Sequence, residues 1–191
     1  MSNLRFIRHA ETDMAGRFCG QSDPPVNSRG QQQILNLIEA IKTELIGAVY
    51  CSDLQRAVTT ARAIADAFSI PVMTRHNLRE INFGEWEGLS WSEIEHRNSA
   101  YAHRWIEAFP NLPAPGGESF AGFQIRVLAE VADIQRLANE TRVAVVTHSG
   151  VMRVVLQGLN KWTDEAAWNH TKEYCSSFTL KLSTAVHEVH Q

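Results

Sequence analysis

Two apolar runs that each end at a histidine stand out in the pattern of hydrophobic and polar positions. Residues 4–7 are mostly apolar and lead into Arg8 and His9, and residues 142–147 form an almost continuous apolar run that leads into His148. Such runs predict buried strands, and the second is typical of a central parallel strand covered on both faces. Open α/β sheets bind ligands at the carboxyl ends of their strands. We therefore predict that the two histidines share one site.

The chain between these runs alternates between helical and strand patterns. Helical spacing predicts helices that begin near residues 28, 54, 90, 118, 151 and 163. Short apolar runs predict strands at residues 48–51, 71–74 and 177–182. This order predicts a single α/β domain over residues 1–191, built as a three-layer sandwich in which helices cover both faces of a mostly parallel sheet.

Two Ser-x-x-Gln patterns mark the expected starts of the first two helices. Ser28 is followed by Gln31, and Ser52 by Gln55, which is the spacing of a capping box. We therefore expect both serine side chains to cap the helices that follow, and Gly47 to end the first of them.

Arg56 is predicted in the first turn of the helix that follows strand 48–51. The free N–H groups and the positive end of the helix dipole favour an anion there, so a positively charged side chain without a bound anion is unfavourable. A bound phosphate would explain the arginine, and an exposed side chain that extends into solvent is the alternative.

The segment from Leu78 to Leu89 is dense in carboxylates, glycines and aromatic residues. Aromatic neighbours can shield a carboxyl group from water, as a general acid requires. Glu80, Glu85 and Glu87 are all candidates, and composition does not choose among them.

Segment 90–117 interrupts the alternation of helices and strands. It is helical in tendency up to residue 109 and then breaks at a stretch rich in proline and glycine. We expect this segment to leave the sheet, cover the site and contact the leaving group. The loop 13–25 follows the first strand and is expected to form another wall.

Composition limits the classes of function. Of 191 residues, 44% are hydrophobic and 20% charged, and the formal net charge is −3, which gives no support to a nucleic-acid or membrane-surface role. The three cysteines, Cys19, Cys51 and Cys175, form no Cys-x-x-Cys pair, and segment 187–190 is not the zinc pattern His-Glu-x-x-His. No apolar leader precedes the first strand, so a cytoplasmic location is expected.

Five blocks taken together resemble the histidine phosphatase superfamily, also called the phosphoglycerate mutase-like family. They occur in the family's order over about residues 4–182. The blocks are Arg8-His9-Ala10-Glu11-Thr12, Ser52-Asp53-Leu54-Gln55-Arg56-Ala57, residues 78–88, Pro115-Gly116-Gly117-Glu118-Ser119 and Thr147-His148-Ser149-Gly150. The resemblance implies a phosphoglycerate mutase-like fold and a phosphatase activity.

The resemblance also implies roles for individual residues. His9 would be the nucleophile that becomes phosphohistidine, and Glu80, rather than the two neighbouring glutamates, the proton donor. Arg8, Arg56 and His148 would form the phosphate pocket. The residues expected to bind the substrate are Arg8, Thr12, Cys19, Gly20, Gln21, Arg56, Glu80, His148, Ser149 and Gly150.

The physical chemistry of phosphoryl transfer agrees with these roles. A phosphate monoester carries about two negative charges, which two guanidinium groups and a protonated imidazole would offset without a metal or another cofactor. The same cations disfavour protonation of His9, which must be neutral to attack. Its other ring nitrogen should donate to a backbone carbonyl, and Glu80 would protonate the leaving alkoxide and then activate water.

Two positions depart from the family's usual pattern. Ala10 stands where glycine is usual, a small change that should be tolerated. Ala15 stands where asparagine is frequent, which removes one polar contact to the phosphate but leaves the mechanism intact.

Within the family, residues 82–88 and 115–119 look most like those of α-ribazole phosphatases of cobalamin biosynthesis and of small broad-range phosphatases. Mutases typically follow the acid with Arg-His-Tyr and carry an adjacent arginine pair, and this chain has neither. A phosphoglycerate mutase and a sugar or nucleotide phosphatase are therefore the alternatives. We expect a small phosphate ester as the partner, neither nucleic acid nor membrane, and leave a homodimer open.

Rival classes find less support. A cysteine phosphatase needs Cys-x5-Arg, whereas four residues separate Cys51 from Arg56. The serine hydrolase motif and the P-loop are both missing from the sequence. A non-catalytic domain that binds a phosphorylated ligand is the remaining rival, but binding would require neither His9 nor Glu80.

Overall fold

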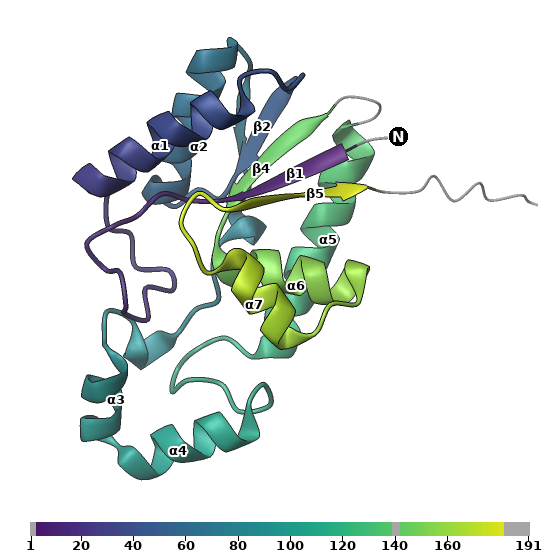
Figure 1. Ribbon diagram of the computed structural model, residues 1–191. Coiled ribbons are helices and arrows are strands. Elements are labelled where there is room, and N and C mark those ends of the chain that lie inside the picture. Colours follow the sequence, from purple (N-terminus) through teal and green to yellow (C-terminus); the bar gives the residue numbers. More distant parts are fainter. Residues whose placement is uncertain (1–2, 139–141, 182–191) are drawn as a thin grey trace, which may run out of the picture.

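A five-stranded sheet forms the centre of the computed structural model, which describes residues 3–138 and 142–181 (Figure 1). The strands are β1 (Asn3–Arg8), β2 (Ala48–Cys51), β3 (Val72–Thr74), β4 (Val143–Thr147) and β5 (Ser177–Lys181). Their order is β3-β2-β4-β1-β5, with parallel pairing throughout except for the antiparallel edge strand β5. The predicted mostly parallel sheet is confirmed.

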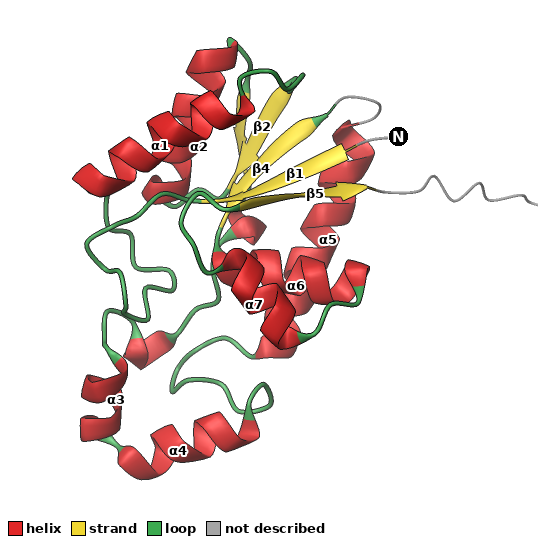
Figure 2. Ribbon diagram, viewed as in Figure 1, coloured by secondary structure: helices red, strands yellow, loops and turns green. Residues whose placement is uncertain are grey.

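Helices cover both faces of the sheet (Figure 2). The main helices are α1 (Ser28–Ile41), α2 (Gln55–Phe68), α5 (Phe120–Ala138), α6 (Ser149–Asn160) and α7 (Asp164–Thr171). Figure 1 shows α1 and α2 on one side of the strands and α5 and α6 on the other. The three-layer α/β fold is thus as predicted.

The buried side chains of β1 and β4 alternate between two hydrophobic clusters. Phe6 and Val145 pack with Phe123 of α5, whereas Ile7 and Val146 belong to the cluster that α1 and α2 form on the opposite face. All five residues of β4 are buried. A strand covered on both faces gains hydrophobic stabilisation from every side chain, which explains its continuous apolar sequence.

The strand register aligns three chain segments at one edge of the sheet. Because β1 and β2 both pair in parallel with β4, the three strands end at the same level. His9, Ser52 and His148 are the first residues after these ends. The amide of His9 donates to the carbonyl of Thr147 at 2.8 Å, and the amide of Ser52 to that of Val146 at 3.0 Å.

The first helix starts and ends differently from the prediction. Asn27, not Ser28, caps α1, since its side chain accepts a hydrogen bond from the Gly30 amide at 2.8 Å. The helix ends at Ile41, well before Gly47. Asparagine and serine are both favoured at cap positions, so the sequence pattern alone does not decide whether Asn27 or Ser28 caps the helix.

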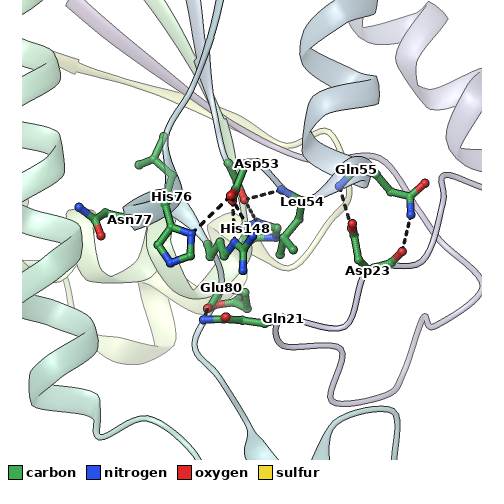
Figure 3. A network of polar contacts seen from close by, with 12 residues as sticks. Gln21, Asp23, Asp53, Leu54, Gln55, His76, Asn77, Glu80 and His148 are labelled. Atoms are coloured by element: carbon green, nitrogen blue, oxygen red, sulfur yellow. Dashed lines mark hydrogen bonds and ion pairs between the residues drawn. The ribbon is translucent and has the colours of Figure 1, made fainter.

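The cap of α2 comes from a distant loop. The carboxylate of Asp23 accepts from the Gln55 amide at 2.7 Å, and its carbonyl accepts from the Gln55 side chain at 2.6 Å (Figure 3). Ser52 lies three residues before the helix, so the predicted capping box is wrong. The local sequence pattern around α2 does not reveal a contact with a residue 32 positions away.

Segment 90–117 leaves the sheet as predicted, and it holds two short helices rather than one. Helix α3 (Trp91–Arg97) starts with a capping box at Ser90, and α4 (Ser99–Ala108) is capped by Asn98, whose side chain accepts from the Tyr101 amide at 3.0 Å. In Figure 1 both helices lie away from the strands. Their own buried cluster contains Trp86, Ile94, Ala102 and Ala114.

Of two 3-10 turns, η1 (His76–Leu78) precedes Glu80 and η2 (Gly84–Trp86) contains Glu85. No helix among the described residues is long and apolar enough to span a membrane. Segment 187–190, expected at the surface, lies outside the described residues.

Candidate active site

A cavity of about 510 Å³ opens at the edge of the sheet where β1 and β4 end. The expected site residues among those that line it are Arg8, His9, Thr12, Cys19, Gly20, Arg56, Glu80, His148, Ser149 and Gly150. Gln21 does not line it. The Gln21 side chain instead donates to the carbonyl of Glu80 at 3.3 Å, and its amide donates to the carboxylate of Glu87 at 2.7 Å (Figure 3).

His9 is buried, with 7% of its surface exposed. Its Nδ1 lies 2.7 Å from the carbonyl of Ala10, so Nδ1 carries the proton and Nε2 keeps its lone pair. Burial lowers the pKa of His9 well below its ordinary value, and the positive charges of Arg56 and Arg8 lower it further. A neutral imidazole with a free Nε2 is the form that can attack phosphorus.

Arg56 points its guanidinium group at His9 from the first turn of α2. Its Nε lies 3.3 Å from the Nε2 atom of His9. The other two nitrogens donate to the carbonyls of Ser22, at 2.5 Å, and Gly20, at 2.7 Å. These carbonyls fix the orientation of a fully buried cation, and they explain why Arg56 is tolerated at a helix start without being exposed.

Arg8 lies between the end of α7 and an aromatic ring. It donates to the carbonyls of Thr171 and Lys172, and its Cζ atom lies 4.0 Å from the centre of the Tyr174 ring. The Tyr174 ring also lies 5.7 Å from the ring of His9. The Nε atom of Arg8 is buried and has no partner among the described residues, so a bound anion can accept from it.

Glu80 enters the cavity beside the start of α6. Its carboxylate accepts from the amides of Ile81, at 2.9 Å, and Gly150, at 3.0 Å. A Cβ atom on Gly150 would lie 2.1 Å from the Glu80 carboxylate. Only glycine at this position therefore leaves room for the carboxylate next to the second histidine.

Arg126 of α5 holds the backbone that carries Glu80. It donates to the carbonyls of Asn77, Arg79 and Glu80 at 2.8 to 3.0 Å, and it forms a two-bond ion pair with Glu118. A planar guanidinium group that donates to several carbonyls at once fixes the orientation of segment 77–80.

Asp53 ties the other side of the same segment to the end of β2. Its carboxylate binds Arg79 through two contacts of 2.6 and 2.8 Å and lies 3.4 Å from His76 (Figure 3). The hydrogen bond from Arg79 lowers the pKa of Asp53. The short motif after β2 thus supports both Glu80 and the start of α2.

The two other candidate glutamates have different surroundings from Glu80. Glu85 is exposed. Glu87 accepts from the amide of Gln21 at 2.7 Å and from the hydroxyl of Ser22 at 2.7 Å, so it anchors the loop whose carbonyls hold Arg56. Only Glu80 among the three lines the cavity.

Aromatic side chains form the wall opposite the histidines. The cavity residues of this wall include Phe18, Phe83, Trp91, Trp105, Phe109 and Phe120. Trp105 lies 5.4 Å from Phe109 between ring centres, and Phe109 lies 5.6 Å from Phe120 of α5. Residues of segment 90–117 therefore line one end of the cavity.

Sequence reasoning missed two residues that hold the site together. Tyr174 precedes a strand with no motif around it, and Arg126 lies in the middle of a helix. Neither position differs from an ordinary surface residue in the pattern of the chain. The signal that could have found them is spatial: both contact backbone or side chains of cavity residues far away in sequence.

No group of three or more His, Cys, Asp or Glu side chains that could hold a metal ion occurs in the part of the chain that the structure describes.

The family model of the histidine phosphatase superfamily (branch 1) matches residues 4–190. The chain belongs to this superfamily. Members of the superfamily with related sequences include the adenosylcobalamin/α-ribazole phosphatase of Escherichia coli, which is 30% identical over 172 residues that cover 87% of this chain and 83% of that protein. Phosphoserine phosphatase 1 of Hydrogenobacter thermophilus is 31% identical over 157 residues, covering 81% and 74%.

Solved structures of superfamily members have the same fold. The α-ribazole phosphatase of Shigella flexneri superposes with a TM-score of 0.86 at 25% identity, over 95% of this chain and 91% of that one. The resemblance drawn from five sequence blocks is thus confirmed over nearly the whole chain.

Because these histidines are buried, we predict that the free energy of unfolding falls at acid pH. His9 stays neutral in the folded protein because its pKa is lowered, whereas the unfolded chain takes up that proton near the ordinary pKa of about 6.5. The contribution of neutral His9 to the free energy of unfolding is therefore fully present above about pH 6.5. Below that pH the free energy of unfolding falls by at most about 1.4 kcal/mol per pH unit on account of this residue. Chemical denaturation between about pH 7.5 and 5.5 should show a smaller pH dependence for His9→Gln than for the wild type.

His96→Gln is the matched control, because His96 is exposed on α3. Its free energy of unfolding should depend on pH as the wild type's does. Equal pH dependence in all three proteins would contradict the assignment of a neutral, buried His9.

Proposed function

We propose that the protein is a phosphomonoesterase that hydrolyses a small phosphate ester through a phosphohistidine at His9. One observation carries this proposal. The Nε2 atom of His9 has its lone pair on the cavity side and lies 3.3 Å from Arg56 Nε. The Nε–H group of Arg56 donates to this nitrogen. A bound phosphoryl group would take over that hydrogen bond and free the lone pair for attack.

The proposed reaction has two steps. His9 Nε2 attacks phosphorus while the bond to the ester oxygen breaks, and Glu80 gives its proton to that oxygen. The Glu80 carboxylate then accepts a proton from a water molecule that attacks phosphohistidine, which releases phosphate and restores both side chains. Arg8 and Arg56 bind the phosphoryl oxygens and offset their charge, and His148 donates a hydrogen bond to one of these oxygens.

A domain that only binds phosphorylated ligands is the alternative from another class. Binding would be served by the two arginines alone. It gives no reason for a histidine whose tautomer is fixed by the Ala10 carbonyl, nor for a carboxylate that lines an anion pocket next to it.

For the substrate, we propose an ester whose leaving alcohol carries a flat apolar group, with α-ribazole 5′-phosphate as the first candidate. The aromatic wall supports this choice, because Trp91 and Trp105 can stack on a planar base. Two relatives are named α-ribazole phosphatases. We propose that residues 1–191 act as one domain in which segment 90–117 contacts this leaving group.

Phosphoserine is the strongest competing substrate, since a related protein is named for it. A charged amino acid needs partners of opposite charge. Besides Arg8 and Arg56, two arginines line the cavity, and both are paired: Arg17 lies 2.8 Å from Glu93, and Arg153 pairs with Asp164. Phosphoglycerate mutase and broad sugar or nucleotide phosphatase activities remain the further alternatives.

The cytoplasmic location stays a prediction of the sequence, which leaves a homodimer open. Fractionation of cells and sedimentation velocity of the purified protein would test them.

The first prediction from this function concerns the nucleophile. The wild type should hydrolyse p-nitrophenyl phosphate at an unchanged rate in excess chelator, and His9→Ala should lose activity by more than about 10³-fold, because no other group can form the covalent intermediate. Steady-state release of p-nitrophenol measures both. The control His96→Ala should keep full activity, and substantial turnover by His9→Ala would rule out the assigned nucleophile.

The second prediction concerns the proton donor. Glu80→Gln cannot protonate the leaving oxygen, so it should slow the hydrolysis of alkyl phosphates at least about tenfold more than that of p-nitrophenyl phosphate, whose leaving group needs little protonation. Phosphate release from both substrates gives the ratio. Glu85→Gln, an exposed carboxylate, should leave both rates unchanged. An equal loss on both esters in Glu80→Gln would assign the acid to another residue.

The third prediction concerns the leaving group. In a panel of esters, kcat/KM for α-ribazole 5′-phosphate should exceed that for phosphoserine, 3-phosphoglycerate and sugar phosphates. Trp105→Ala should lower this value about tenfold while it leaves kcat/KM for ethyl phosphate nearly unchanged, because only the larger alcohol reaches the wall. Trp162→Ala, outside the cavity, is the control. A preference for phosphoserine would overturn the proposed substrate and leave the phosphatase activity intact.

A further inference from the structure

The two histidines of the cavity are anchored through opposite edges of their rings. His9 uses Nδ1 to bind the Ala10 carbonyl at 2.7 Å, which leaves Nε2 on the cavity side. His148 uses Nε2 to contact the Ser52 hydroxyl at 2.9 Å, and its Nδ1 is buried with no partner among the described residues. The centres of the two rings lie 5.0 Å apart. One pocket thus holds an imidazole in each orientation.

The hydrogen bonds of Ser52 fix the direction of its proton. Ser52 is fully buried directly after β2. Its Oγ atom accepts from the backbone amide of Leu54 at 3.3 Å. A hydroxyl group has a single proton to donate, a buried donor needs an acceptor, and Nε2 of His148 is the acceptor within reach of Ser52 Oγ among the described residues, so we infer that the proton points to it.

The surroundings of His148 keep its ring neutral. Burial lowers the pKa of His148 well below its ordinary value, and the positive charges of Arg56, Arg8 and Arg126 lower it further. A neutral imidazole has one N–H. If Nε2 accepts from Ser52, this proton lies on Nδ1. The titratable and charged groups near the ring are Arg8 at the end of β1, His9 directly after it, Arg56 of α2, Arg126 of α5, and Glu80 beside Gly150.

We propose that Ser52 is a positioning residue that holds His148 as the Nδ1–H tautomer, so that a neutral His148 donates a hydrogen bond to the phosphoryl group. This rests on the proposed function, since the acceptor is the phosphoryl oxygen of the substrate. The same tautomer then serves two tasks: His9 presents a lone pair to phosphorus, and His148 presents a proton to oxygen. The Ala10 carbonyl and the Ser52 hydroxyl decide which nitrogen faces the cavity.

Ser52→Ala tests the proposal through its pH dependence. Without the hydroxyl, the single proton of His148 can move to Nε2, and kcat/KM for p-nitrophenyl phosphate near neutral pH should fall roughly 10- to 100-fold, as for the loss of one hydrogen bond to a charged group. At lower pH the imidazolium form carries protons on both nitrogens, and the charge of the bound phosphate favours this form. The ratio of wild-type to variant activity should therefore shrink severalfold as the pH falls.

Thr147→Val is the matched control for a merely structural effect. Thr147 is fully buried directly before His148, and its hydroxyl donates to the Leu78 carbonyl at 2.8 Å. Its loss removes a similar buried hydrogen bond without touching His148. The Tm of this variant should fall, whereas its activity relative to the wild type should stay constant with pH. A constant ratio for Ser52→Ala as well would overturn the proposal.

A measurement on the wild type does not depend on how the variants fold. Nitrogen NMR of ¹⁵N-histidine-labelled protein at neutral pH should show a protonated Nδ1 and an unprotonated Nε2 for His148. The opposite assignment would overturn the role of Ser52. If the wild type hydrolysed no phosphate ester, the proposed function would fail, and the same spectrum would still decide whether Ser52 sets the tautomer.

Discussion

The parallel pairing of β4 with both β1 and β2 is the constraint on which the site depends. It brings residues 9, 52 and 148 to one edge of the sheet, although the first and last are 139 positions apart in the sequence. Backbone hydrogen bonds continue this pairing one residue past the strands, so the reactive side chains sit on the most rigid part of the fold. The buried strand β4 supplies this rigidity, because its four apolar side chains pack into the two hydrophobic clusters and the Thr147 hydroxyl donates to the Leu78 carbonyl.

The positively charged pocket is held mainly by backbone carbonyls. Arg56 binds the carbonyls of Gly20 and Ser22, and Arg8 binds those at the end of α7. Carbonyl groups fix a guanidinium group without cancelling its charge, whereas carboxylates would compete with a bound anion. Carboxylates such as Glu87 and Asp53 act one layer further out, where they hold the loops.

The sequence predicted those parts of the molecule that follow from local periodicity and strand ends. The order of strands and helices, the buried β4 and the meeting of His9 with His148 belong to this group, because one residue's position along a strand determines where its side chain points. Contacts between distant segments could not be predicted from the sequence pattern. Asp23 caps α2 in place of Ser52, Gln21 contacts the backbone of Glu80 instead of the cavity, and Tyr174 stacks on Arg8. Each depends on how loops fold back onto the sheet, which no short pattern encodes.

Four residues of the aromatic wall, Phe18, Phe83, Trp91 and Trp105, pack on a small hydrophobic cluster separate from the two clusters on the faces of the sheet, whereas Phe120 packs against the cluster that contains Phe123. Substitutions in α3 and α4 can therefore reshape the far end of the cavity while the strand edge keeps its geometry. Selection, or a protein engineer, could exchange one leaving group for another at this end without rebuilding the phosphate pocket. This separation offers a structural reason why relatives of one fold bear the names of different phosphate esters.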